Sequence, residues 1–195
     1  MYKLGEYKLK NLKSLEKELG DIGKIAVNLL KDKRVEAEVR YYAASALGNL
    51  GTAATPYVKD IVDILKDKSV EASVRYSAAS ALGNLGTAAT PYVKDILNFL
   101  KDKSVEAEVR SSAASALGNL GTAATPYVKD ILNFLKDKSV EAEVRYSAAS
   151  ALGNLGTAAT PYVKDILNFL KDKSVEAEVR SSAASALGNL GTAAT

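Results

Sequence analysis

The sequence predicts an all-α, right-handed solenoid, in which helical hairpins stack side by side. Three observations predict it. Residues 55–89, 90–124, 125–159 and 160–195 repeat one 35-residue unit, and a diverged copy covers 20–54. Each unit carries two apolar patterns at helical spacing, without the sustained alternation that is typical of strands. A fixed period of this length is typical of arrays in which each unit buries its apolar face only against its neighbours.

The first helix of each unit is predicted from "TPYVKDILNFLKDK", residues 90–103 in the third copy. Its apolar residues fall at i, i+3, i+4 and i+7, so they share one helical face. These are Val93, Ile96, Leu97 and Leu100. Pro91 suits the first helical position, because its fixed φ is helical and its missing N–H has no intrahelical partner there. Thr90 before it can cap the helix.

The second helix is predicted from "SVEAEVRSSAASALGNLG", residues 104–121. Ser104 is an expected N-cap, and Gly121 is an expected terminator beyond the last turn. Gly118 is a poor helix former inside the last turn, so we expect a tight packing contact at this position.

The two ends of the array differ from its middle. Residues 1–19 are predicted to form a separate capping helix, because leucines recur on one stripe and lysines lie on the other side. The leucines are Leu9, Leu12, Leu15 and Leu19. The last repeat carries the same apolar pattern as the internal ones, so we expect an uncapped C-terminal repeat and end-to-end self-association through it.

The composition excludes several classes of function. The chain has no Cys and no His, which removes the usual nucleophiles, general bases and metal ligands. We therefore expect no catalysis, no metal and no cofactor. The net charge of +3 lies within residues 1–40, which leaves the repeats neutral and argues against nucleic acid. No stretch is apolar enough to cross a membrane and no signal-peptide core is present, so a cytoplasmic location without membrane contact is expected.

The pattern V-R-x-x-A-A-x-A-L-G-x-L-G recurs in register and resembles HEAT repeats, specifically the short bacterial phycobilisome-lyase-like kind. It occupies 39–51, 74–86, 109–121, 144–156 and 179–191. In that family, an Asp in the turn between the helices and the Arg of "VR" form a ladder between repeats. The resemblance implies such a structural ladder from Asp67, Arg75, Asp102, Arg110, Asp137, Arg145, Asp172 and Arg180.

The resemblance also implies that the second helices line a concave surface, which solenoids use for binding. On a helical wheel, the side opposite the buried stripe holds Ser111 and Ser115. At the position of Ser111 the copies alternate between Tyr and Ser, with a second period of 70 residues. Tyrosines there are suited to anchor a partner. The predicted partner-binding residues are Tyr41, Tyr76, Ser111, Tyr146, Ser181, Ser80, Ser115 and Ser150.

These observations predict a non-catalytic scaffold that binds a protein or peptide along the face of the second helices. Three alternatives stay open at this point. The chain could be an engineered, consensus-like repeat scaffold without a natural ligand, or the recognition fragment of a larger sensor protein. It could also be a chaperone similar to the bilin lyases, some of which carry such repeats.

Overall fold

A computed structural model describes residues 2–191 of the chain, with side chains from Ser14 onward. Within these residues all regular secondary structure is helical, and short turns join the two helices of each repeat. The first helices of the repeats are α1 (Tyr2–Lys31), α3 (Val58–Lys66), α5 (Val93–Lys101), α7 (Val128–Lys136) and α9 (Val163–Lys171). The second helices are α2 (Ala37–Asn49), α4 (Ala72–Asn84), α6 (Ala107–Asn119), α8 (Ala142–Asn154) and α10 (Ala177–Asn189). Short 3-10 segments join the repeats: η1 (Gly51–Tyr57), η2 (Gly86–Tyr92), η3 (Gly121–Tyr127) and η4 (Gly156–Tyr162).

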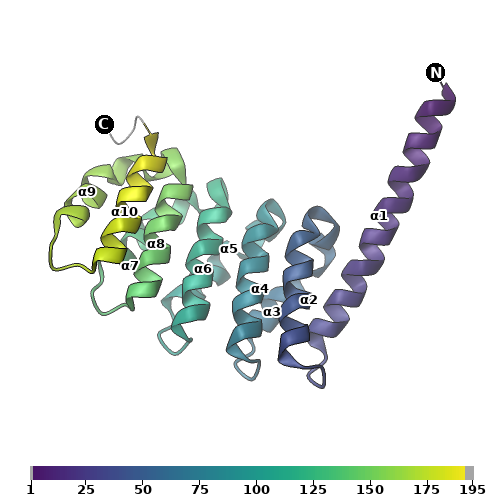
Figure 1. Cartoon of the computed structure of the whole chain (residues 1–195), viewed down its shortest axis with the longest axis horizontal. Coiled ribbons are helices and arrows are strands. Elements are labelled where there is room, and N and C mark those ends of the chain that lie inside the picture. The colour runs from purple at the N-terminus through teal and green to yellow at the C-terminus, as the bar shows by residue number, and fades with distance from the viewer. Residues whose placement is uncertain (1, 192–195) are drawn as a thin grey trace.

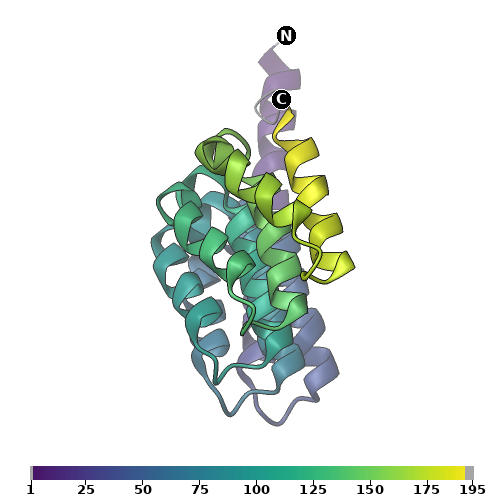
Figure 2. The same cartoon turned by 90° about the vertical axis from the view of Figure 1, so that its left-hand side faces the viewer.

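The helices form two layers, as Figures 1 and 2 show. Successive second helices pack directly against one another, from α2 to α10. Each first helix packs mainly on the second helix of its own repeat, and successive first helices meet only marginally. The second helices therefore lie closer together, and their layer forms the inner side of the stack. This all-helical array of stacked pairs with a 35-residue period confirms the predicted fold class.

A continuous apolar core runs between the layers and through every junction. In α5, Val93, Ile96, Leu97 and Leu100 are all buried, as their spacing predicted. Small residues fill the space between second helices, where Ala113, Ala114 and Ala116 are fully buried in α6. Alanine suits this place because its side chain lets two helix backbones approach closely.

Two glycines mark the C-terminal end of each second helix, one in its last turn and one just beyond it, and each is required for a different reason. Gly121 has a φ of 55°, a left-handed conformation that a side chain rarely adopts, and it ends the helix. A Cβ on Gly118 would lie 2.7 Å from the Cα atom of Ala151 in the next repeat. Both expectations for these residues are thereby confirmed.

The helix starts differ from the predicted ones. Pro91 lies inside η2, and α5 begins two residues later at Val93. Ser104 does not cap the second helix, which begins at Ala107. Its amide and hydroxyl instead donate to Asp102 Oδ1, over 2.9 and 2.6 Å. A preceding aspartate competes for the serine and holds it in the turn, as Asp side chains often do.

The N-terminal segment is not a separate helix, because α1 runs without a break across the expected boundary at residue 19. Its first half stands clear of the stack (Figure 1). Leu15 of the expected stripe is 51% exposed. The side chains of Leu9 and Leu12 lie outside the described residues, so capping by residues 1–19 stays a prediction.

Candidate interaction surface

The exposed side of the second helices forms one surface, which we call the helix-B face. Four positions of each helix are directed towards it, spaced i, i+3, i+7 and i+11, opposite the buried stripe. In α6 they are Glu108, Ser111, Ser115 and Asn119. The asparagine row, which the sequence analysis missed, follows from the same helical spacing. Its members are Asn49, Asn84, Asn119, Asn154 and Asn189.

Tyrosines are the largest apolar groups on the helix-B face. Tyr76 is exposed, Tyr146 is 48% exposed, and Tyr41 is half-buried. Tyr42 was missed by the sequence analysis, although it stands where the later copies have Ser. It is 62% exposed and packs edge-on against Tyr41, with ring centroids 5.2 Å apart. Tyr42 lies beside the helix-B face and points towards the N-terminal end of the stack, so the first, second and fourth repeats each present one ring on the face itself.

The predicted serines do not all lie open on this face. Ser80, Ser115 and Ser181 are exposed, and Ser150 is partly buried. Ser111 is only 8% exposed, and its Oγ lies 2.8 Å from the Oγ of Ser147 in the next helix. The prediction of an exposed Ser111 is thus wrong, because a short side chain at this level stays within the tight contact between α6 and α8.

A neighbouring row of serines fixes the spacing of the second helices. Ser77 Oγ donates to the Tyr41 carbonyl over 2.8 Å, and Ser112 Oγ donates to the Tyr76 carbonyl over 3.0 Å. Each bond joins one second helix to the preceding one. These hydroxyls are buried in the junctions. They hold the rows of the helix-B face in register and are not available to a partner.

The arginines of the "VR" motif form a ladder with glutamate, and the expected pairing with aspartate is wrong. Arg110 is 1% exposed, its Nε donates to the Leu100 carbonyl over 3.1 Å, and its Nη1 donates to Glu141 over 2.6 Å. Three equivalents repeat this arrangement: Arg40 with Glu71, Arg75 with Glu106, and Arg145 with Glu176. Arg110 pairs with the glutamate because Glu141 is the N-cap residue of the next second helix, α8, and lies directly beside the guanidinium. Buried in this way, these arginines cannot clamp an acidic ligand.

The turn aspartates form a second ladder, with lysines of the preceding repeat. The ion pairs are Lys33–Asp67 at 2.8 Å, Lys68–Asp102 at 3.3 Å and Lys138–Asp172 at 3.4 Å. Bonds from the Ser104 hydroxyl and amide, with Lys68 nearby, lower the pKa of Asp102 to about 2. Ser139 and Ser174 lower the pKa of Asp137 and Asp172 in the same way. Both ladders join neighbouring repeats, and their partners differ from the expected ones.

Comparison with known proteins agrees with this repeat geometry. A family model described as HEAT repeats matches residues 24–99 and 58–140, which together make up more than half of the chain. The chain belongs to the HEAT-repeat family. A second model, of the PBS lyase HEAT-like repeat, matches residues 144–172.

Two solved structures of engineered proteins have a similar fold to this HEAT array. One is 21% identical with a TM-score of 0.57, and covers 92% of this chain and 93% of its own. The other is 24% identical with a TM-score of 0.54, and covers 93% of this chain and 90% of its own. A search of curated proteins gave no significant match.

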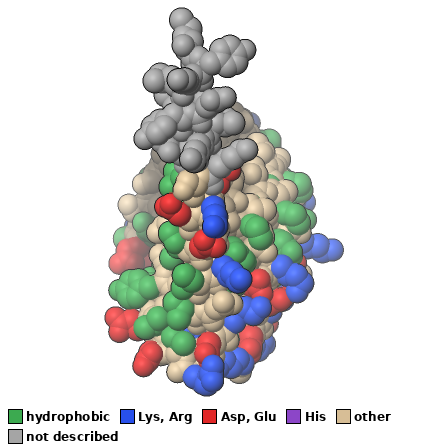
Figure 3. Space-filling model, turned by 90° about the vertical axis from the view of Figure 1, so that its right-hand side faces the viewer, with side chains coloured by type: hydrophobic (Ala, Val, Ile, Leu, Met, Phe, Trp, Pro, Cys, Tyr) green, Lys and Arg blue, Asp and Glu red, His purple; other side chains and the backbone are tan. Residues whose placement is uncertain are grey.

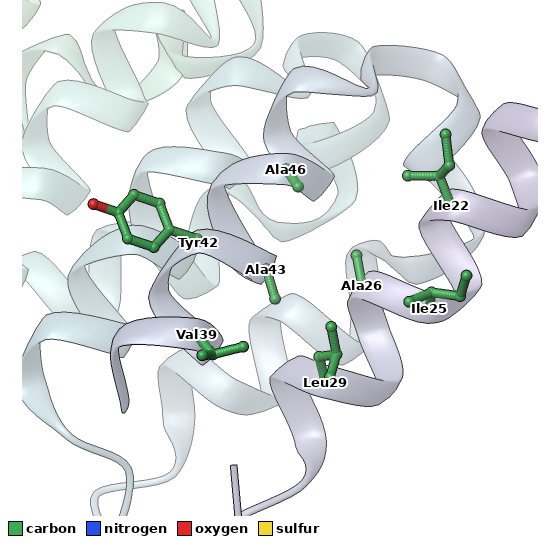
Figure 4. A pocket seen from close by; sticks show the side chains of 8 residues that line it. All are labelled: Ile22, Ile25, Ala26, Leu29, Val39, Tyr42, Ala43 and Ala46. Carbon is green, nitrogen blue, oxygen red and sulfur yellow. The ribbon is translucent and has the colours of Figure 1, made fainter. Parts of the chain in front are cut away.

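The HEAT repeats carry little that suggests chemistry. Among the described residues, no cluster of acidic side chains could hold a metal ion. No helix within residues 2–191 is both long and apolar enough to span a bilayer. An open, apolar groove of about 460 Å³ lies between α1 and α2, at the N-terminal end of the stack (Figure 4). Its lining residues are Ile22, Ile25, Ala26, Leu29, Val39, Tyr42, Ala43 and Ala46.

Proposed function

We propose that this HEAT array is a non-catalytic scaffold whose helix-B face binds an extended peptide or a helix of a partner protein. The tyrosines on one face of an otherwise polar surface carry this proposal: Tyr76 and Tyr146, which are exposed, and Tyr41, which is half-buried. Tyr is enriched among the residues that dominate binding energy, because it offers a large apolar ring with a polar end.

The spacing of the tyrosines suits a peptide that crosses the second helices. Packed helices lie about 8–10 Å apart, so two helix steps separate Tyr76 from Tyr146 by roughly 20 Å. An extended chain advances about 3.3 Å per residue, so about six residues bridge that distance. The short Ser111 leaves a shallow step between the two rings. A peptide with an apolar anchor at each end of such a segment fits this relief.

The charge of the face favours a basic partner. Exposed glutamates stand at the start of the second helices, at Glu38, Glu108, Glu143 and Glu178. Four of the five arginines nearby are buried in the ladder and add no accessible cation: Arg40, Arg75, Arg110 and Arg145. Nucleic acid requires a cationic surface to neutralise its phosphates, which this face does not offer. We therefore propose a peptide in which Lys or Arg flanks the apolar anchors.

The proposed absence of catalysis rests on the kind of acidic groups present. The chain has no His or Cys. Within the repeats, each kind of aspartate or glutamate recurs at the repeat spacing, and most are paired with a Lys or Arg of the preceding repeat, as in Lys68–Asp102, Lys101–Asp130 and Arg110–Glu141. General acid–base catalysis needs such groups converging in a pocket, with pKa values moved towards neutrality.

The test is binding to a displayed library of random peptides, comparing the chain with a Tyr41/Tyr76/Tyr146→Ser variant. Serine already occupies this position in two copies, at Ser111 and Ser181. The substitutions should therefore leave the fold unchanged, which circular dichroism checks.

Peptides selected by the parent chain should be rich in basic and apolar residues, and should bind the variant at least about tenfold more weakly, the loss expected for hot-spot truncation. The Ser181→Tyr variant is the matched control, because it adds a tyrosine at the same position of the fifth repeat. It should strengthen the binding of long peptides. Equal affinity for all three proteins would refute a site on the helix-B face. Selection of no peptide at all would favour a scaffold without a natural ligand.

A further inference from the structure

Every junction between repeats has the same polarity. The repeat on the N-terminal side contributes cations, such as Arg110 to Glu141 and Lys101 to Asp130. It also contributes a glycine, such as Gly118, against an alanine of the following repeat. The C-terminal face of a repeat is thus basic with a hollow, and the N-terminal face of the next is acidic with a matching alanine.

Within residues 2–191, no further repeat packs on the C-terminal face of the last repeat. Among the described side chains, Lys171, Lys173 and Arg180 form no ion pair, although their internal equivalents mostly do. Leu167 is 36% exposed, whereas its equivalent Leu132 is 3% exposed. A Cβ on Gly188 would meet no described atom within 4 Å.

The first repeat presents the complementary N-terminal face. Asp32, Glu36 and Ala46 stand 35 residues before Asp67, Glu71 and Ala81, which complete the first internal junction. The same end of the stack carries the open apolar groove between α1 and α2, which Ala46 lines (Figures 3 and 4). Within it, Val39 is 41% exposed, whereas its equivalent Val74 is fully buried.

We propose that two copies of the chain join head to tail, with the last repeat of one docking onto the first repeat of the next. Arg180 then faces Glu36 of the second copy, Lys173 faces Asp32, and Gly188 receives Ala46. The internal junctions supply the template, because copy 160–194 is identical in sequence to copy 90–124, which already makes this contact. A head-to-tail contact uses two different surfaces, so it repeats and builds longer arrays.

The junction between copies is weaker than an internal one, because three features of the first repeat differ. Ile25 replaces the aspartate that pairs with a lysine at internal junctions, as Asp60 does. Tyr42 replaces the buried Ser77. Arg34 already binds Asp32, with Nη2 2.7 Å from Oδ2. Association is therefore reversible and depends on concentration and salt.

Sedimentation velocity over a concentration series tests the proposal, with the Gly188→Leu variant as the block. In the single chain the new side chain meets open space, so the fold stays intact, which circular dichroism checks. In the head-to-tail contact it collides with α2 of the next copy. The mean mass of the parent chain should rise above 20.6 kDa with concentration and fall again with added salt. The variant should raise the dissociation constant at least about tenfold.

A second variant, Ala46→Leu, blocks the other face and makes the test specific for head-to-tail contact. Each variant alone should stay monomeric. Their equimolar mixture should give dimers and nothing larger, because one free face of each kind remains in the pair. Three outcomes would overturn the proposal: a parent chain that is monomeric at every concentration, a Gly188→Leu variant that associates like the parent, or a mixture without dimers.

Discussion

The close contact at Gly118 predicts opposite effects for one substitution made in two identical repeats. The changes are Gly118→Ala and Gly188→Ala, at equivalent positions of copies that have the same sequence. At Gly118 a Cβ atom would lie 2.7 Å from the Cα and 3.0 Å from the Cβ of Ala151, inside the 3.4–4 Å of ordinary contact. At Gly188 it would meet no described atom within 4 Å.

The expected magnitudes follow from two terms. Alanine is better than glycine in a helix interior by about 0.5–1 kcal/mol, and this gain applies at both sites. Overpacking in a closely packed contact costs about 1–3 kcal/mol, and applies only at Gly118, where backbone rather than a flexible side chain blocks the new atom. We therefore expect Gly188→Ala to stabilise the chain slightly, and Gly118→Ala to destabilise it by about 1–2 kcal/mol.

Urea unfolding followed by circular dichroism measures both variants against the parent chain. Hydrogen exchange adds the location, because amides of α6 and α8 should lose protection only in Gly118→Ala. If both variants shift the unfolding midpoint in the same direction by the same amount, Gly118 is not there to permit close packing of α6 against α8.

Two further predictions concern the ladders. Arg110→Ala leaves the Leu100 carbonyl without its donor and opens a cavity, so it should lower the free energy of unfolding by about 2–4 kcal/mol. Arg180→Ala should cost less than half as much in the same urea assay, because Arg180 is only partly buried and bonds one carbonyl; equal losses would contradict this. The lowered pKa of Asp102, about 2 in the folded chain against about 3.9 unfolded, stabilises the fold above pH 4, and this contribution is lost as the pH falls towards 2. The urea midpoint should accordingly stay level from pH 6 to pH 5 and fall between pH 4 and pH 2, and a midpoint that stays level to pH 2 would contradict the role of the turn aspartates.

The helices and their pairing could be predicted from the sequence because the repeat supplies the same local pattern five times. The spacing of Val93, Ile96 and Leu100 defines a face without further information. Gly118 and Gly121 are informative because few explanations fit a glycine in or just after the last turn of a helix. These features depend on residues within one repeat.

The features that were predicted incorrectly depend on competition between neighbours in space. Ser104 can cap a helix, but Asp102 accepts its two donors first. From the sequence, either the turn aspartate or the glutamate that precedes the second helix could pair with Arg110. Only the packing of α6 against α8 selects Glu141. Ser111 shares its wheel position with exposed tyrosines, and a side chain that ends within the contact is buried where a longer one emerges. A helical wheel gives the direction of a side chain, but not how far it must extend to pass the neighbouring helix and become exposed.

The uniform junctions make repeats interchangeable in number. Each junction joins the same C-terminal face to the same N-terminal face. If residues 90–124 are removed, repeat 55–89 can therefore pack on repeat 125–159 with the same ion pairs, and Arg75 can bind Glu141 as it now binds Glu106. The fold therefore tolerates a change of length by single units. The tyrosine row changes with such a deletion, since loss of this copy places Tyr76 and Tyr146 in adjacent helices. Loss of residues 90–159 instead leaves Tyr76 followed by Ser181 in the next helix, as Tyr76 is now followed by Ser111. In a chain that grows or shrinks by copying, the packing of the junctions recurs with every repeat, and the Tyr/Ser pattern recurs with every two.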